Sequence, residues 1–292
     1  MSLYEHIHPD FRYVMDLTDK ERMAFLYEPR WIEYQAAATV LGTLQDMLQT
    51  PHVLRTRNLM IVGDSNNGKT ALFKRFQDLL SRGDADEAVE RARPVIIDGL
   101  CLNGTEKDFY LAILSCFSVS HRVSDSTGTL RDQVIARCRA FHVRMIVIDD
   151  FHMLMDSTLR RRQDILKAIK ILSNELLITV VLVGFEETKQ TLHELPQLAA
   201  RFNVMSLPLW SLDPEFLRLL ASFEMVLALK RPSELSGSDL ATAIYEVSGG
   251  TLGRVHGFLV ECAREAIVSG VERIDLNVVG KVKQAWEWSV GR

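Results

Sequence analysis

An apolar run at residues 59–62 leads directly into a glycine-rich loop, and this feature restricts the fold more than any other. The loop has the spacing Gly63-x-x-x-x-Gly68-Lys69-Thr70, and a helix pattern follows it. Strand, loop and helix in this order form the setting of a phosphate-binding Walker A motif. The two glycines would let the backbone approach phosphate oxygens closely, and the loop amides with the helix N-terminus would bind the anion.

Each part of this loop has an expected role in binding ATP and Mg²⁺, the two predicted cofactors. Lys69 would reach the β- and γ-phosphates, and the Thr70 hydroxyl would be a ligand of Mg²⁺. The residues expected to surround the phosphates are Gly63, Asp64, Ser65, Asn66, Asn67, Gly68, Lys69, Thr70 and Ala71.

A second apolar run, at residues 145–148, ends in the carboxylates of Asp149 and Asp150. This is a Walker B pattern, in which Asp149 would face the phosphate loop and hold Mg²⁺ directly or through water. Asp150 takes the position where hydrolysing ATPases usually have a glutamate that orients the attacking water. Because its side chain is one methylene shorter, we predict slow hydrolysis. His152 is an alternative group for positioning that water.

Short apolar strands alternate with helices in the middle of the chain, as is typical of a parallel sheet covered on both faces. The expected strands lie at 59–63, 95–98, 145–148 and 178–184, with a last one after Arg201, and the helices between them lie at 106–119, 130–141 and 160–176. Beyond about Leu209 only helices are expected, at 214–229, 238–247, 254–269 and 276–290. The predicted domains are a helical extension (1–50), an α/β P-loop core (51–208) and a small all-helical lid (209–292).

Composition adds little about partners and location. The formal net charge of −4 gives no indication of nucleic acid, so a basic site would have to be local. No apolar run approaches the roughly 20 residues that span a bilayer, and no secretory signal is visible. The four cysteines are scattered, which is typical of thiols in a reducing compartment. We therefore expect a cytoplasmic protein without a membrane partner.

An ATPase core followed by a helical lid resembles the AAA+ layout. The segment 198–202, Leu-Ala-Ala-Arg-Phe, resembles one that presents an arginine finger to a neighbouring subunit, which implies this role for Arg201. The segment 249–254, Gly-Gly-Thr-Leu-Gly-Arg, resembles a sensor 2 region, which implies that Arg254 contacts the nucleotide. The resemblance thus adds two arginines to Asp150 as catalytic candidates.

At finer grain the chain is similar to the TniB family, the TnsC-like ATP-dependent regulators of transposition. The similarity lies in His8-Pro9, Arg30-Trp31-Ile32-x-Tyr34, Arg57-Asn58-Leu59 with the loop after it, Val147 to His152, Val181 to Gly184, and the lid through Gly253-Arg254. The resemblance implies an ATPase that forms homo-oligomers, rings or filaments, on double-stranded DNA. It would mark target DNA and recruit a DDE transposase (TniA/TnsB-like) and a TniQ-type protein.

Two positions depart from this family pattern. Asp150 stands where a glutamate is usual, and Phe185 stands where a threonine that could sense the γ-phosphate often follows the fourth strand. Both departures concern the rate of hydrolysis and leave nucleotide binding as expected.

Several alternatives stay open from the sequence. The same core occurs in helicase loaders of the IstB and DnaC type and would also suit a nucleotide-gated switch that binds only protein. Trp31 and Tyr34 would stack near adenine or pack the N-terminal helices. The basic run at residues 160–162 would be a solvated face or a contact for DNA or a partner.

The polar segments 101–107 and 124–131 are candidates for the DNA contact, because the resemblance to AAA+ proteins implies that these loops face the channel of a ring. The expected DNA-binding residues are Asn103, Thr105, Lys107, Thr127, Thr129 and Arg131. Small polar and cationic groups suit phosphate oxygens rather than base edges. The alternative is that Lys107 caps its own helix and that residues 124–129 are only a loop.

Overall fold

A computed structural model describes residues 4–50, 57–81, 93–97, 104–117, 122, 124–194 and 196–290, with backbone only for 93–97 and 287–290. The chain forms two compact units, and each is described by itself. The sheet unit combines Gln35–Ser65 with Lys69–Leu207, and the helical unit combines Met1–Tyr34, Asn66–Gly68 and Pro208–Arg292.

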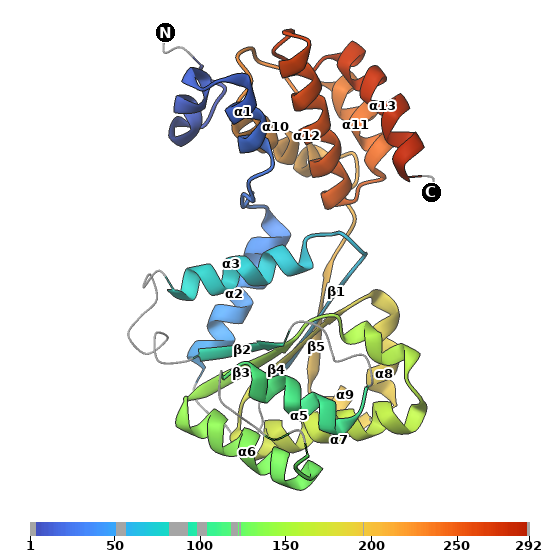
Figure 1. The fold of residues 1–292 in the computed structure, drawn as a ribbon. Coiled ribbons are helices and arrows are strands. Elements are labelled where there is room, and N and C mark those ends of the chain that lie inside the picture. The colour runs from blue at the N-terminus through green and yellow to red at the C-terminus, as the bar shows by residue number, and fades with distance from the viewer. Residues whose placement is uncertain are drawn as a thin grey trace. The chain divides into compact units, whose positions relative to one another are not determined.

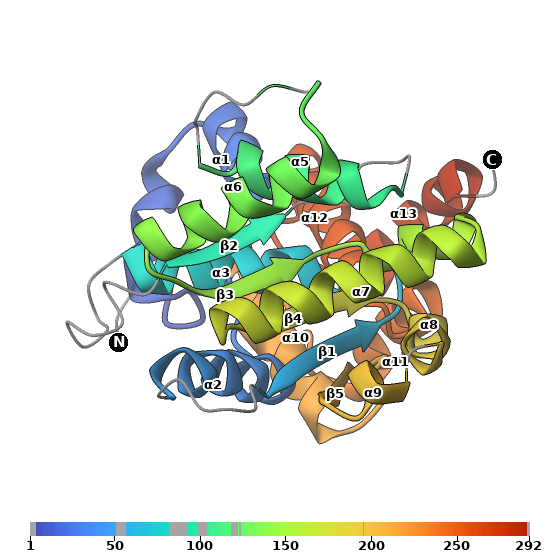
Figure 2. The ribbon, with the colours of Figure 1, turned by 90° about the horizontal axis from the view of Figure 1, so that it is seen from below.

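The sheet unit is built on five parallel strands in the order β2-β3-β4-β1-β5 (Figure 2). These strands are β1 (Asn58–Gly63), β2 (Arg93–Ile97), β3 (Val143–Ile148), β4 (Thr179–Gly184) and β5 (Phe202–Leu207). The register places Ile61 of β1 opposite Val183 of β4 and Met205 of β5. Since parallel strands all end at one edge of a sheet, the loops after β1, β3 and β4 start side by side.

Helices cover both faces of this sheet. One face carries α5 (Glu106–Ser115), α6 (Thr127–Ala140) and α7 (Leu159–Leu176), which contact one another below the sheet in Figure 1. The other face carries α2 (Gln35–Gln49) and α3 (Lys69–Ser81). Every residue of β1 and β4 is buried, as expected for parallel strands covered on both sides.

The helical unit packs N-terminal and C-terminal segments around a large apolar cluster and a smaller one. Its elements are a short 3₁₀ segment η1 (Pro9–Asp16), α1 (Asp19–Leu26), α10 (Pro214–Leu227), α11 (Ser238–Ser248), α12 (Leu252–Val268) and α13 (Leu276–Val290) (Figure 1). Leu26 of α1 belongs to the same buried cluster as Phe216, Phe258 and Val279. The N-terminal helix is therefore part of the larger cluster.

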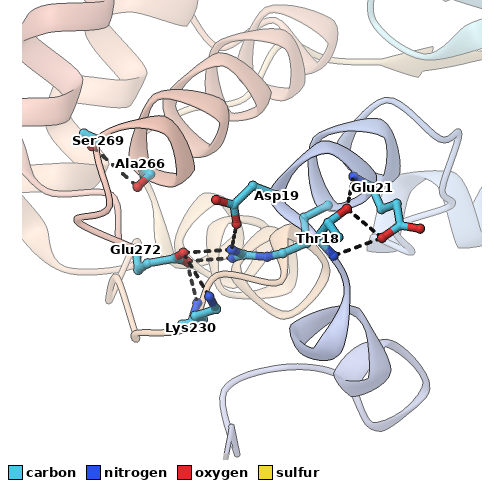
Figure 3. Close-up of polar contacts among 8 residues, drawn as sticks. Thr18, Asp19, Glu21, Lys230, Ala266, Ser269 and Glu272 are labelled. Atoms are coloured by element: carbon cyan, nitrogen blue, oxygen red, sulfur yellow. Dashed lines mark hydrogen bonds and ion pairs between the residues drawn. The ribbon is translucent and has the colours of Figure 1, made fainter.

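A buried ion pair adds a polar tie between α1 and the C-terminal helices. Arg22 is 1 % exposed, and its guanidinium donates to both carboxylate oxygens of Glu272 at 2.7 and 2.6 Å and to Asp19 at 3.2 Å. Figure 3 shows Lys230 next to Glu272, and the Lys230 backbone amide also donates to this carboxylate at 3.3 Å. Burial raises the pKa of Glu272, but the hydrogen bonds and charges of Arg22 and Lys230 together outweigh it and hold the pKa below its ordinary value.

We expect Arg22→Ala to lower the free energy of unfolding by about 3 kcal/mol, because the Glu272 carboxylate loses its two short hydrogen bonds to the guanidinium and keeps the longer contact with Lys230 at 3.5 Å. Arg218→Ala, which removes the exposed pair with Glu215, is the control and should cost about 0.5 kcal/mol or less. Urea unfolding would measure both. Equal losses in the two variants would show that the Arg22 pair adds no more than a surface pair.

The same pair predicts a pH dependence. A carboxyl whose pKa is lowered by folding stabilises the protein above its unfolded pKa and loses this effect as the pH falls through the folded value. The stability gap between the wild type and Glu272→Gln should therefore be full at pH 7 and close below the ordinary value of 4.5. A gap that is constant from pH 7 to pH 3 would contradict the assignment.

The structure confirms the predicted fold class: a parallel α/β P-loop core, N-terminal helices and a small C-terminal helical part. Two local expectations were wrong. The helix expected at 106–119 ends at Ser115 and is followed by a turn at residues 116–117. The loop expected at 124–129 ends earlier, because Ser126 caps α6 by accepting the Thr129 amide at 3.2 Å, so the helix begins at Thr127. In the described part of the chain, no helix is both long and apolar enough to cross a membrane.

Candidate functional site

The loop after β1 has backbone geometry that requires glycine at two places. A Cβ on Gly63 would lie 2.9 Å from the carbonyl oxygen of Leu207 on the neighbouring strand β5. Gly68 has φ +83°, a left-handed conformation that side chains disfavour. These constraints are the local reason for the glycines of the motif.

Lys69 lies folded back onto this loop. Its ammonium donates to the carbonyl oxygens of Gly63 and Asp64 at 2.8 and 2.7 Å, and the residue is only 7 % exposed. Burial lowers the pKa of Lys69, while the charges of Asp149 and Asp150 act in the opposite direction. A phosphate would offer this buried cation a full negative charge where it now has carbonyl dipoles.

The side chains expected to bind Mg²⁺ lie together. The Thr70 hydroxyl donates to Asp149 Oδ2 at 3.2 Å, and Asp149, at the end of β3, is 4 % exposed. One hydroxyl and one carboxylate at one sheet edge fit a Mg²⁺ that takes its other ligands from phosphates and water. The described residues contain no group of three or more His, Cys, Asp or Glu that could hold a metal ion by itself. A site of the kind formed by Thr70 and Asp149 does not need such a group, because phosphates and water supply the other ligands.

Asp150 follows in a left-handed conformation, with φ 48°. Its amide donates to Asp149 Oδ1 at 2.8 Å, and its carboxylate is half exposed, 3.8 Å from Nδ1 of His152. The His152 ring stacks on that of Phe185 with 3.9 Å between centroids. Phe185 in turn lies 4.9 Å from the Lys69 ammonium. His152 thus lies next to both Asp150 and Phe185, the two positions that depart from the family pattern.

The tip of the loop, Asn66–Gly68, belongs to the helical unit. Asn66 O accepts the Gly253 amide at 2.9 Å, and Asn67 Oδ1 accepts the Leu252 amide at 3.3 Å. Asn67 also donates to Pro208 O at 3.0 Å. A Cβ on Gly253 would lie 2.1 Å from Asn66 Oδ1, so this contact needs glycine there. Sequence reasoning did not find these ties, because no local pattern marks them.

The two candidate arginines make hydrogen bonds within their own units. Arg201 Nη1 donates to Asn174 Oδ1 of α7 at 2.5 Å, and Arg254 Nη2 donates to Val247 O at 3.0 Å. Arg254 is exposed and directly follows Gly253, the residue that binds Asn66 O. The roles of both arginines on nucleotide stay predictions.

The aromatic residues before α2 lie in the helical unit. The Tyr34 ring meets Trp210 edge to face at 5.1 Å, and burial raises the pKa of Tyr34 to about 12. A Cβ on Gly68 would lie 3.9 Å from the Tyr34 hydroxyl, which puts this tyrosine beside the loop tip. The Trp31 indole nitrogen is buried without a hydrogen-bond partner in the described part of the chain. Tyr34 thus packs on Trp210, and the adenine contact of Trp31 and Tyr34 stays a prediction.

Most candidate DNA residues lie at two neighbouring helix starts. Thr105 caps α5 by accepting the Asp108 amide at 3.2 Å, and Lys107 follows in the first turn. Thr127, Thr129 and Arg131 lie in the first turns of α6, which contacts α5. The Arg131 guanidinium pairs with Asp132 at 3.1 Å. Asn103 lies outside the described residues.

Acidic groups accompany these cations. Glu106 and Asp108 share the first turn of α5 with Lys107. The charge of Glu106 also contributes to raising the pKa of Arg131, behind the larger effects of the bond to Asp132 and its charge. Phosphates bound here would therefore meet two cations within a mixed surface, which favours weak contact by a single subunit.

Comparison with known proteins gives one family and one fold. A family model described as "Bacterial TniB protein" matches residues 22–212. The fold is similar to Aeropyrum pernix ORC2 in ADPNP-ADP complexes, with TM-score 0.67, 14 % identity and coverage of 90 % of this chain and 71 % of that one.

Two further solved structures have a similar fold. Pyrobaculum aerophilum Cdc6p has TM-score 0.63, 17 % identity and coverage of 91 % and 70 %. Aeropyrum pernix ORC1 in complex with DNA has TM-score 0.58, 16 % identity and coverage of 91 % and 69 %. At these identities the similarity establishes the AAA+ fold alone. No curated protein matches the sequence significantly.

Proposed function

Because the chain belongs to the TniB family, we propose that it is an ATP-dependent regulator of transposition that assembles on target DNA and recruits the transposase. The observation that carries the nucleotide part is the cluster of Lys69, Thr70 and Asp149 at one sheet edge. The ADP and ADPNP named for the ORC2 structure support the same ligand class.

The proposed reaction is the hydrolysis of ATP to ADP and phosphate. A water oxygen would bond to the γ-phosphorus while the bond from that phosphorus to the bridging oxygen breaks and ADP leaves with the electron pair. Asp150 is the candidate to orient the water and accept its proton, and Lys69 would compensate the charge on the phosphates. Mg²⁺, held by Thr70 and Asp149, would neutralise further phosphate charge when bound.

Assembly would couple this reaction to DNA. An Arg201 that reaches the nucleotide of a neighbouring subunit would favour oligomers while the γ-phosphate is present, and hydrolysis would remove that contact. DNA named in the ORC1 structure supports DNA as a partner class. The proposed protein partners are the transposase and a TniQ-type protein, and the proposed location is the cytoplasm.

We expect the double charge reversal Lys107→Glu with Arg131→Glu to abolish ATP-dependent DNA binding while leaving ATP affinity unchanged. Each subunit would lose two phosphate contacts, and an assembly multiplies this loss. Filter binding of duplex DNA at several salt concentrations would measure it. Wild-type binding should fall steeply with salt and depend little on sequence.

The matched control reverses two exposed cations elsewhere in the sheet unit, with Lys74→Glu and Arg137→Glu. It changes net charge by the same amount, so it separates a local site from the overall field. Full DNA affinity in the Lys107 and Arg131 variant, or an equal loss in the control, would exclude these helix starts as the DNA surface.

A further inference from the structure

Phe185 is held in a fixed place beside the phosphate loop. It directly follows β4, which lies between β3 and β1, and its amide donates to Thr188 Oγ1 at 3.1 Å. Thr188 is fully buried, and a Cβ on Gly184 would lie 2.8 Å from its hydroxyl. The tight turn therefore fixes the Phe185 backbone, and the ring lies 4.9 Å from the ammonium of Lys69.

A phenyl ring has no donor for a phosphate oxygen, but it presents a flat face to His152. The two rings are nearly parallel, with an interplanar angle of 28° and centroids 3.9 Å apart. The imidazole comes from the 3₁₀ segment η2 (Phe151–Asp156), which begins directly after the two carboxylates that follow β3. The stack thus places the imidazole against the same ring that lies 4.9 Å from the Lys69 ammonium, the group expected to reach the β- and γ-phosphates.

One ring nitrogen of His152, Nδ1, is buried and makes no hydrogen bond within the described residues. The side chain as a whole is 20 % exposed. The nearest acidic atom, Asp150 Oδ1, is 3.8 Å away, which is too long for a hydrogen bond. Buried polar atoms normally have partners, so an unpaired one at this place points to a ligand.

We propose that His152 donates a hydrogen bond to the terminal phosphate of bound ATP and that Phe185 is the positioning residue that holds the imidazole there. The inference rests on the proposed function, since it requires ATP at the phosphate loop. ADP lacks the γ-phosphate, so the contact makes His152 a means of distinguishing ATP from ADP. The His152 donor would take over the role of the polar side chain that is missing at position 185, the residue after β4, where this chain has a phenyl ring.

The test compares the affinities of purified full-length variants for the non-hydrolysable analogue AMPPNP and for ADP, both with Mg²⁺, by calorimetric titration. His152→Ala should weaken AMPPNP binding about tenfold and leave ADP binding unchanged, because only the analogue carries the contacted phosphate. His152→Phe keeps an aromatic ring on Phe185 without a donor and should lose the same preference. Phe185→Leu should reduce the preference partly.

His193→Ala, which changes an exposed histidine of the same unit, is the matched control and should behave as the wild type. Unchanged ADP binding also shows that each variant is folded. A His152→Phe variant with the wild-type preference, or equal loss of both nucleotides in His152→Ala, would overturn the inference. A wild-type protein that binds neither nucleotide would instead overturn the proposed function.

Discussion

Lys69→Ala is expected to weaken ATP binding by roughly 100-fold, since truncating one partner of a buried charge pair has an effect of this size. Hydrogen bonds to the carbonyl oxygens of Gly63 and Asp64 hold the Lys69 ammonium at the loop, and the residue is 7 % exposed. Its truncation therefore removes this cation from beside the phosphate charge. Calorimetric titration with ATP and Mg²⁺ would measure the loss.

Lys74→Ala is the matched control, because it removes an exposed lysine from the same helix α3. It should bind ATP as the wild type does. An affinity of Lys69→Ala equal to that of this control would exclude the loop as the phosphate site.

Asp149→Asn should reduce Mg²⁺-dependent hydrolysis by a factor of about 1,000, which corresponds to the loss of one strong electrostatic contact to the transition state. The amide keeps the shape of the side chain and the hydrogen bond to Thr70 but removes the negative charge that holds the cation. Phosphate release under single-turnover conditions would measure the rate.

Asp156→Asn, at the exposed end of η2, is the control for a charge change near this edge. The wild-type rate itself should lie well below the median of about 10 s⁻¹ for enzymes, because of Asp150 and Phe185. Hydrolysis that persists in Asp149→Asn at the wild-type rate would show that Asp149 does not hold the metal.

The sequence predicted the fold well where local signals are strong. Buried strands such as β1 and β4 are continuous apolar runs, and the loop after β1 carries fixed glycine spacing, so both were identified with bounds close to those observed. The start of α6 was missed although Ser126, three residues before Thr129, is an N-cap signal that sequence alone could have supplied.

The candidate site was predicted only in part, for a physical reason. Lys69, Thr70 and Asp149 follow from motif chemistry and from the shared edge of parallel strands. The stack of His152 on Phe185 and the binding of Asn66 by Gly253 join residues far apart in the chain. Such contacts depend on how whole elements pack, and no spacing in one sequence encodes them.

The central claim, ATP-dependent assembly on DNA, is tested most directly by electron microscopy of the full chain with duplex DNA in the presence of AMPPNP or ADP. We predict rings or filaments on DNA with AMPPNP and their absence with ADP, because assembly depends on the terminal phosphate. Particles that stay monomeric and off DNA with both nucleotides, although the protein binds AMPPNP, would contradict the account.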